Sequence, residues 1–284
     1  MFVEVRQSEF SMRFKIRNPK SEGRKKPETR NPKPRLSFGC FSAQSPARLL
    51  PLTTLIIATR NAHKVAEIQS ILGPAFRCQA VSHLEGAPEV VEDRTTFAGN
   101  ATKKAVELAN WLASLANLQI PRPQFVLADD SGLEVDALNG APGVYSARFA
   151  VLDGGLPGNS ATAANNAKLL RLLENVPADK RTARFRCVIA LSPLSETARS
   201  VSEAGIEELE SRTKLFEGAC EGRVGLAPRG KGGFGYDPLF FPTGYEQSFA
   251  ELGEEIKNHL SHRARALEQL KRWLSGHDAG PQKR

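Results

Sequence analysis

The stretch that decides the fold is residues 53–64, which read TTLIIATRNAHK. Its first half is a short apolar, β-branched run, typical of a buried strand. Polar residues follow, and from about His63 to Leu72 apolar residues return at helical spacing until Gly73-Pro74 ends the pattern. A strand that runs through a short loop into a helix indicates the α/β class.

The same alternation of strands and helices continues along the chain. Apolar spacing predicts a long helix from Phe97 to about Asn117, with Thr95 or Thr96 as its N-cap. Residues 192–215 are polar and predict a hairpin connection of variable length. Further elements are predicted at residues 124–128 (strand), 161–174 (helix), 183–191 (strand) and 261–275 (helix).

The composition of the chain changes at about residue 52. Residues 1–52 hold twelve of the 39 Lys and Arg residues but only four acids, which accounts for the whole net charge of +8. The remainder is neutral, and we expect it to form one domain at 53–276 and a flexible tail at 277–284. Because the excess charge belongs to the extension, it does not indicate a nucleic-acid-binding surface on the domain.

The basic extension is rich in Arg, Lys, Ser and Pro and has little apolar periodicity, so we expect it to be disordered. Three interpretations stay open for it. It is a dispensable extension, an organelle-targeting peptide, or an arm that binds polyanions weakly. Its four acids argue against the targeting interpretation.

The four cysteines lie far apart and form no Cys-x-x-Cys pair, which favours reduced thiols and a cytoplasmic location over a disulfide framework or a zinc site. They are Cys40, Cys78, Cys187 and Cys220. No apolar run approaches the roughly 18 residues that a membrane span needs. We therefore expect no membrane partner.

The first candidate site is the strand-to-helix junction at residues 58–64. A helix N-terminus offers free backbone N–H groups to a phosphate, and Thr59, Asn61 and Lys64 add side-chain donors and a charge. The junction lacks the glycines of a Walker loop or a dinucleotide fingerprint. Thr59 or Asn61 could equally be a helix cap, and both interpretations stay open.

The second candidate is the acidic pair Asp129-Asp130, which the predicted strand limits place at the end of an apolar strand, together with Glu92 and Ser131. Adjacent acids there are costly unless a cation joins them, and Mg²⁺ prefers carboxylates plus waters and phosphates. Strand alternation sends the two acids to opposite faces, so one of them faces a given cleft. The alternative is that Asp-Asp-Ser-Gly is simply a turn.

Two further candidates lie near the C-terminus. In residues 230–238, glycines flank Phe234 and Tyr236, so that a ring face could stack on a nucleobase; the alternative is that these rings fill the core. Lys257 and residues 261–263 place cations at a helix start, which suits an anionic or carbonyl-bearing ligand. The alternative there is an ordinary surface helix start.

Together these stretches resemble the inosine/xanthosine triphosphate pyrophosphatase family, whose members hydrolyse non-standard purine nucleotides. The matching segments cover most of residues 53–275. They are ATRNAHK (58–64), EDRTTFAGNA (92–101), LADDSGLEVDALNGAPGVYSAR (127–148), GGFGYDP (232–238) and SHRARA (261–266). The resemblance implies an elongated mixed β-sheet flanked by helices, with two lobes and a substrate cleft between them, and a homodimer.

The resemblance also implies the roles of individual residues. Glu92 and Asp130 would bind Mg²⁺, and Asp130 would be the catalytic proton acceptor. Thr59, Asn61, Lys64 and Lys257 would hold the phosphates. The full set of implied substrate-binding residues is Thr59, Arg60, Asn61, Ala62, His63, Lys64, Ser131, Phe234, Gly235, Tyr236, Asp237, Lys257, His262 and Arg263.

One departure from the family pattern and one alternative ligand accompany this assignment. Arg60 stands where the family often has glycine, and Asp93 could replace Glu92 as the metal ligand. The expected reaction converts ITP, dITP or XTP to the monophosphate and pyrophosphate. The alternatives are a pyrophosphatase for other modified nucleotides and a non-catalytic nucleotide- or RNA-binding protein that uses the basic extension.

Overall fold

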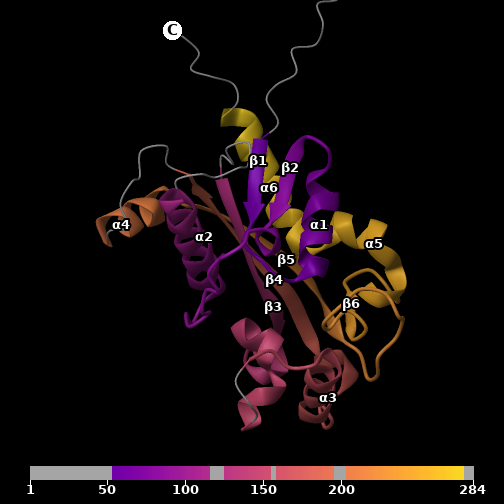
Figure 1. Cartoon of the computed structure of the whole chain (residues 1–284). Coiled ribbons are helices and arrows are strands. Elements are labelled where there is room, and N and C mark those ends of the chain that lie inside the picture. Colours follow the sequence, from indigo (N-terminus) through magenta and orange to yellow (C-terminus); the bar gives the residue numbers. More distant parts are fainter. Residues whose placement is uncertain (1–52, 116–124, 155–157, 195–202, 278–284) are drawn as a thin grey trace, which may run out of the picture. The chain divides into compact units, whose positions relative to one another are not determined.

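The computed structural model of the chain describes residues 53–115, 125–154, 158–194 and 203–277 (Figure 1). The predicted extension at 1–52 lies outside the described residues. So does the predicted tail, apart from His277, which ends the last helix. The domain limits drawn from composition therefore remain predictions.

The described strands form a mixed six-stranded sheet in the order β2-β1-β3-β4-β5-β6. Strand β1 runs parallel to β2 and β3, and the pairs β3–β4, β4–β5 and β5–β6 are antiparallel. The strands are β1 (Thr53–Ile57), β2 (Phe76–Ala80), β3 (Phe125–Val135), β4 (Thr182–Pro193), β5 (Lys214–Val224) and β6 (Phe240–Pro242).

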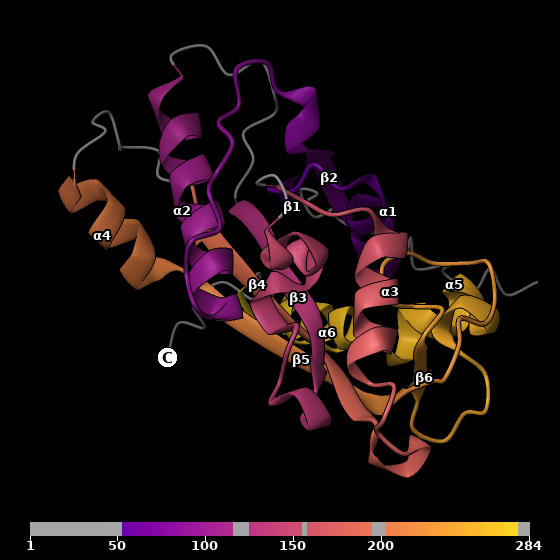
Figure 2. The same cartoon turned by 90° about the horizontal axis from the view of Figure 1, so that it is seen from below.

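Helices cover both faces of this sheet (Figures 1 and 2). They are α1 (Ala62–Leu72), α2 (Phe97–Ser114), α3 (Thr162–Leu172), α4 (Glu203–Arg212), α5 (Phe249–Leu260) and α6 (His262–His277). Helices α2 and α4 pack on one face, and α1 and α6 pack on the other. The expected α/β fold with a mixed sheet flanked by helices is confirmed.

The long strands β3, β4 and β5 continue past β1 to a third apolar cluster. There Leu133 and Phe185 pack against Leu169 of α3 and against Phe240 and Phe249. These three long strands thus connect the part of the fold that carries α1 and α2 to the part that carries α3 and β6 (Figure 1). No helix among the described residues has the length and apolar character needed to cross a membrane.

The first strand and helix match the prediction closely. Strand β1 is buried along its whole length, as its apolar sequence predicts. Asn61 caps the start of α1, and Gly73, whose φ is positive (71°), caps its end. Thr96, one of the two predicted caps, begins α2 by accepting the N–H of Gly99. The predicted end of that helix near Asn117 falls outside the described residues.

Two predictions about local structure are wrong. The strand expected to end at Ala128 continues to Val135, because β4 pairs with it along its whole length; Asp129 and Asp130 therefore lie within a strand, and the turn interpretation fails. The segment 192–215 is not a simple hairpin connection. It contains α4, which packs on α2, and β5 begins at Lys214.

Candidate functional site

The junction between β1 and α1 is built as a helix cap. The Asn61 Oδ1 atom accepts the N–H groups of His63 (3.0 Å) and Lys64 (3.2 Å), and Thr59 Oγ1 accepts the N–H of Asn61 (3.2 Å). The capping alternative therefore holds for Asn61. Arg60 donates to the carbonyl oxygen of Ala87 at 2.8 Å, so its guanidinium secures the segment before α2.

The two adjacent acids point to opposite faces of β3, as alternation predicts. Asp130 faces α2, where Asn100 Nδ2 donates to its Oδ2 atom at 3.2 Å. Asp129 faces α1 and α6, where it binds Lys64 at 2.5 Å and Arg263 Nε at 2.9 Å. Each acid thus belongs to a separate set of charges.

Lys104 of α2 is a site residue that the sequence analysis missed. Its ammonium group lies 2.8 Å from Glu92 Oε1, 3.2 Å from Asp130 Oδ1 and 2.8 Å from the carbonyl oxygen of Asp129. The sequence contained an indication of this role, because Lys104 and Asn100 interrupt the apolar face of an otherwise amphipathic helix. A buried cation on such a face needs anionic partners.

The charges of Glu92, Lys104 and Asp130 shift one another's pKa values. Burial raises the pKa of Asp130, and the nearby ammonium groups of Lys104 and Lys64 do not fully offset it. Burial also acts to raise the pKa of Glu92, but the charge of Lys104 outweighs it, and the pKa lies below its usual value. Burial acts to lower the pKa of Lys104, yet Asp130 and Glu92 hold it above its usual value. The most basic carboxylate of the group is thus Asp130.

Glu92 and Asp93, the two candidate metal ligands, pair with different lysines. Glu92 faces Asp130 across Lys104, whereas the exposed Asp93 pairs with Lys103 at 2.8 Å on the surface. Among the described residues, no three His, Cys, Asp or Glu side chains gather as a cage for a metal ion. Two carboxylates converging on one cation nevertheless fit Mg²⁺, which takes one or two carboxylates and completes its shell with water and phosphate.

Asp129 is the centre of the second set of charges. Besides Lys64 and Arg263, it accepts hydrogen bonds from Ser131 Oγ (2.9 Å) and from the thiol of Cys187 (3.1 Å). Burial acts to raise its pKa, but Arg263 and Lys64 hold the pKa well below the usual value. Asp129 is therefore an ionised, fully buried anchor for the two cations.

Glu67 extends this set and was also missed from the sequence. It lies on α1 one turn after Lys64, binds Lys257 at 2.6 Å and pairs with Arg263 Nη1. Lys257 in turn binds Asp237 Oδ2 at 2.6 Å. Lys257, the expected phosphate ligand, and Arg263, one of the expected substrate-binding residues, are therefore both held by carboxylates.

Phe234 is fixed from several sides. Its N–H donates to Asp237 Oδ2 at 2.8 Å, and the ammonium group of Lys257 lies 4.5 Å from its ring centroid. The ring of His63 stacks with it at a centroid separation of 5.4 Å. Tyr236 is buried and donates its hydroxyl hydrogen to the carbonyl oxygen of Ser146 at 3.0 Å.

His262 is buried beside these groups and has an unused polar atom. Its ring stacks on Phe185 at 4.7 Å, and its Nδ1 atom has no hydrogen-bond partner among the described residues. Burial and the neighbouring charge of Arg263 hold its pKa well below the usual value, so the imidazole is neutral. A buried polar atom without a partner is costly unless a ligand supplies one.

Two adjoining cavities bring the predicted residues together, with volumes of about 230 Å³ and 220 Å³. The predicted residues lining the first, here called the carboxylate cavity, are Thr59, Arg60, Asn61, Lys64, Glu92, Asp130 and Ser131. Those lining the second, the aromatic cavity, are Asn61, Lys64, Ser131, Phe234, Gly235, Tyr236, Asp237, Lys257, His262 and Arg263. Both walls also include Ala147 and Asn159, and neither includes Ala62 or His63.

The similarity to known proteins extends over the part of the chain that forms this site. The sequence pattern of the Ham1 family matches residues 55–273. The chain belongs to the Ham1 family. It is 48% identical over 216 residues to a dITP/XTP pyrophosphatase of Desulforamulus reducens, covering 76% of this chain and 92% of that protein. It is 44% identical to a protein of the same name from Shouchella clausii, covering 79% of this chain and 98% of that protein.

Solved structures of Ham1 proteins share the fold. The protein from Coxiella burnetii is 34% identical with a TM-score of 0.61, and the protein from Staphylococcus aureus is 34% identical with a TM-score of 0.60. In both cases the match covers 78% of this chain and 98% of the other. The resemblance read from the sequence is therefore confirmed.

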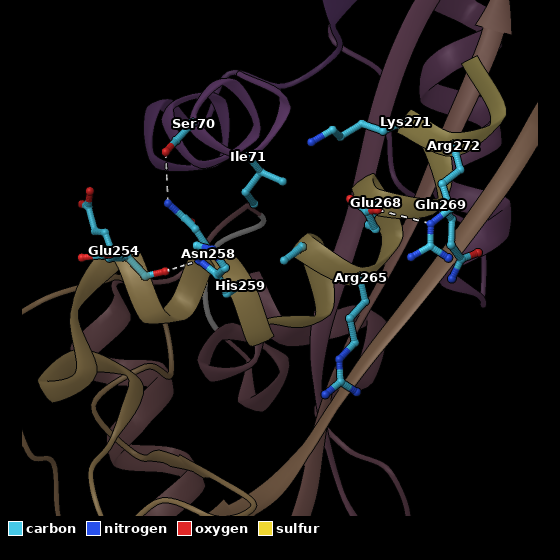
Figure 3. A pocket seen from close by; sticks show the side chains of 12 residues that line it. Ser70, Ile71, Glu254, Asn258, His259, Arg265, Glu268, Gln269, Lys271 and Arg272 are labelled. Carbon is cyan, nitrogen blue, oxygen red and sulfur yellow. Dashed lines mark hydrogen bonds and ion pairs between the residues drawn. The ribbon is translucent and has the colours of Figure 1, made fainter. Parts of the chain in front are cut away.

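This Ham1-family chain has a larger cavity elsewhere, of about 930 Å³, between α1, α5 and α6 (Figure 3). Charges of both signs line it, and Asn258 donates to Ser70 across its wall at 3.1 Å. It contains none of the residues predicted from the sequence. Size alone thus does not locate the site in this protein.

Proposed function

We propose that this chain is a nucleoside-triphosphate pyrophosphatase that converts non-standard purine triphosphates such as dITP, ITP and XTP to monophosphate and pyrophosphate, with Mg²⁺ as cofactor. The observation that carries this proposal is the pair of adjoining cavities, which share Asn61, Lys64 and Ser131. One holds paired carboxylates with cations, and the other holds an aromatic ring and the unpaired Nδ1 atom of His262. The names of the relatives support the same activity.

The carboxylate cavity supplies what phosphoanhydride hydrolysis requires. Glu92 and Asp130 would hold Mg²⁺, which neutralises charge on phosphate oxygens when bound. Lys64 and Lys104 place two ammonium groups beside the phosphates, and the N-terminus of α1 adds its dipole. Catalysis here depends on positioning and electrostatics rather than on a covalent intermediate.

Asp130 is the proposed proton acceptor. The attacking water forms a bond to the α-phosphorus, the bond from that phosphorus to the bridging oxygen breaks, and pyrophosphate leaves. The water proton goes to a carboxylate oxygen of Asp130. Burial raises the pKa of Asp130, which makes it a better base than an exposed aspartate.

The aromatic cavity supplies base recognition. A purine would stack on Phe234, and the unused Nδ1 atom of His262, when it carries the proton, would donate to the carbonyl at position 6 of hypoxanthine or xanthine. Adenine has an amino group at that position, so the donor would stay unpaired, and such a loss can separate substrates by orders of magnitude. Arg263 positions this end of the site through Asp129 and Glu67.

Two further features are part of this proposal. They are a homodimer, which the family resemblance implies, and a cytoplasmic location, which the dispersed cysteines favour. Light scattering of the purified protein measures the first, since a dimer has twice the mass of the 31.0 kDa chain. A monomer at micromolar concentration would remove the dimer from the proposal.

The decisive experiment measures pyrophosphate release from ITP, XTP, dITP, GTP and ATP, with and without Mg²⁺. We expect release from the first three, little from the last two, and none without the metal. Comparable turnover of ATP and ITP would contradict the base selectivity, and preference for another modified nucleotide would favour the alternative pyrophosphatase. If release persisted in Asp130→Asn, the assigned proton acceptor would be wrong; if wild type released none, a binding protein would be favoured.

A further inference from the structure

Glu92 lies in a stretch of backbone that no sheet or helix supports. Residues 87–94 form neither helix nor strand, so no ladder of backbone hydrogen bonds fixes this segment. A metal ligand there needs other restraints, because coordination tolerates only small displacements. Side-chain contacts must therefore hold Glu92 in front of Asp130.

Two side chains bind Glu92 itself, Lys104 and Arg148. Arg148 Nη2 donates to the main-chain oxygen of Glu92 at 3.0 Å, and Arg148 Nη1 lies 3.4 Å from its Oε2 atom. One guanidinium group thus holds both the backbone and the carboxylate of the same residue. The planar, fixed fork of arginine makes this double contact possible, and lysine cannot reproduce it.

Arg148 itself stands on a rigid support. It ends a 3₁₀ turn, Gly143–Arg148, which packs directly on β3. Ser146 of this turn accepts the N–H of Leu133 at 2.9 Å and donates to the carbonyl oxygen of Gly143 at 2.6 Å. The ring of Tyr145 lies 5.2 Å from the guanidinium carbon of Arg148 and covers it.

The position of Arg148 separates it from the substrate. Its neighbour Ala147 lines both cavities, but Arg148 lines neither. Its contact with the site therefore runs through Glu92. A direct role in binding phosphate does not follow from this geometry.

We propose that Arg148 is a positioning residue that fixes Glu92 for metal binding by tying the 87–94 segment to the turn on β3. The inference rests on the proposed function, because it takes Glu92 as a ligand of the divalent cation. Removal of partners that orient metal ligands typically costs about 10- to 100-fold in metal affinity or activity. Loss of Arg148 should therefore weaken binding of the divalent cation and leave metal-free nucleotide binding unchanged.

The test measures binding of a non-hydrolysable α,β-methylene analogue of ITP by calorimetry, with and without Mn²⁺. In the wild type, Mn²⁺ should tighten analogue binding. In Arg148→Gln this tightening should fall by about tenfold or more, while the metal-free dissociation constant stays within about twofold. Arg148→Lys, which keeps the charge, should lie between the two. Faster hydrogen exchange of residues 87–94 should accompany the defect.

Arg186→Gln is the matched control, because Arg186 pairs with Glu217 at 3.0 Å on an exposed part of β4 and β5. It should behave as the wild type in every assay. Equal Mn²⁺ tightening in Arg148→Gln and wild type would overturn the inference, as would a loss of metal-free binding equal to the loss with metal. If Arg148→Gln does not fold, Arg148→Lys decides, and wild-type metal coupling there overturns the proposal.

The two proposals fail in different ways. A wild-type protein that does not release pyrophosphate from ITP would refute the proposed function. An active wild type whose Mn²⁺ coupling is unaffected by the loss of Arg148 would refute only the positioning role.

Discussion

Lys104 shows how one residue can define a site. Its ammonium group is nine-tenths buried and sits between Glu92 and Asp130, whose like charges would otherwise face each other. Removing one partner of a buried ion pair leaves an uncompensated charge, and such losses typically cost about 3–5 kcal/mol. The residue therefore serves stability and activity together.

Lys104→Met should lower the free energy of unfolding by about 3 kcal/mol, with a further rise in the pKa of Asp130. It should also lower kcat by about 100-fold, because a preorganised cation beside the phosphates is lost. Urea unfolding and pyrophosphate release measure the two effects. Lys103→Met is the control: its partner Asp93 is exposed, so the change should stay below about 1 kcal/mol. A stable, fully active Lys104→Met protein would contradict the assignment.

At the scale of elements, prediction succeeded where the signals were local. The strand, cap and helix over residues 53–72 depend on neighbouring residues, and the structure has them as predicted. The limits of β3 depend on β4, whose partner residues lie 48 to 68 positions away in the chain. The polar helix α4 shows too little apolar periodicity to be recognised. Buried polar partners such as Glu67 became visible only through their tertiary contacts.

The contact between the 3₁₀ turn and β3 gives a test at this scale. A Cβ atom on Gly132 would lie 2.4 Å from the carbonyl oxygen of Gly143 and 2.5 Å from Ser146 Oγ, so the turn would have to move. Gly132→Ala should therefore destabilise the protein by about 2–3 kcal/mol, the cost of overpacking a fixed backbone. It should also weaken Mn²⁺ coupling, because Arg148 moves with the turn.

The control for this substitution is Gly276→Ala, near the end of α6, where a Cβ atom meets nothing within 4 Å. It should be neutral or slightly stabilising, since alanine favours helix more than glycine does. Thermal unfolding of the three proteins measures the difference. If Gly132→Ala unfolds at the wild-type temperature, the turn is not held on β3 as described.

At the scale of the whole domain, a row of alternating charges connects the two cavities. The charged residues come from β3, α1, α5, α6 and the loop before β6. Ion pairs between them, most of them buried, link the base end of the site to the phosphate end. In order, its members are Asp237, Lys257, Glu67, Arg263, Asp129 and Lys64. Because each charge is buried or half-buried beside an opposite one, a neutral group placed among them experiences a strong field.

His262 is that neutral group, and it makes stability depend on pH. Burial, together with the charges of Arg263 and Lys257, lowers its pKa well below the usual value of 6.5, and Asp129 offsets this only in part. Below pH 6.5 the unfolded chain therefore binds a proton that the folded chain excludes. Stability contributed by this residue is thus present above pH 6.5 and falls with acidification, by at most about 1.4 kcal/mol per pH unit.

His262→Phe removes this proton while keeping a ring that can stack on Phe185. Between pH 7 and 5 the wild type should lose more stability than the variant, by about 1–2 kcal/mol, in urea unfolding at each pH. Asp237, whose pKa burial raises, acts in the opposite sense at lower pH, but both proteins share it and the difference cancels its effect. Parallel pH profiles would mean that His262 accepts a proton in the folded state. Its Nδ1 atom could then not be assigned as a neutral donor to the purine.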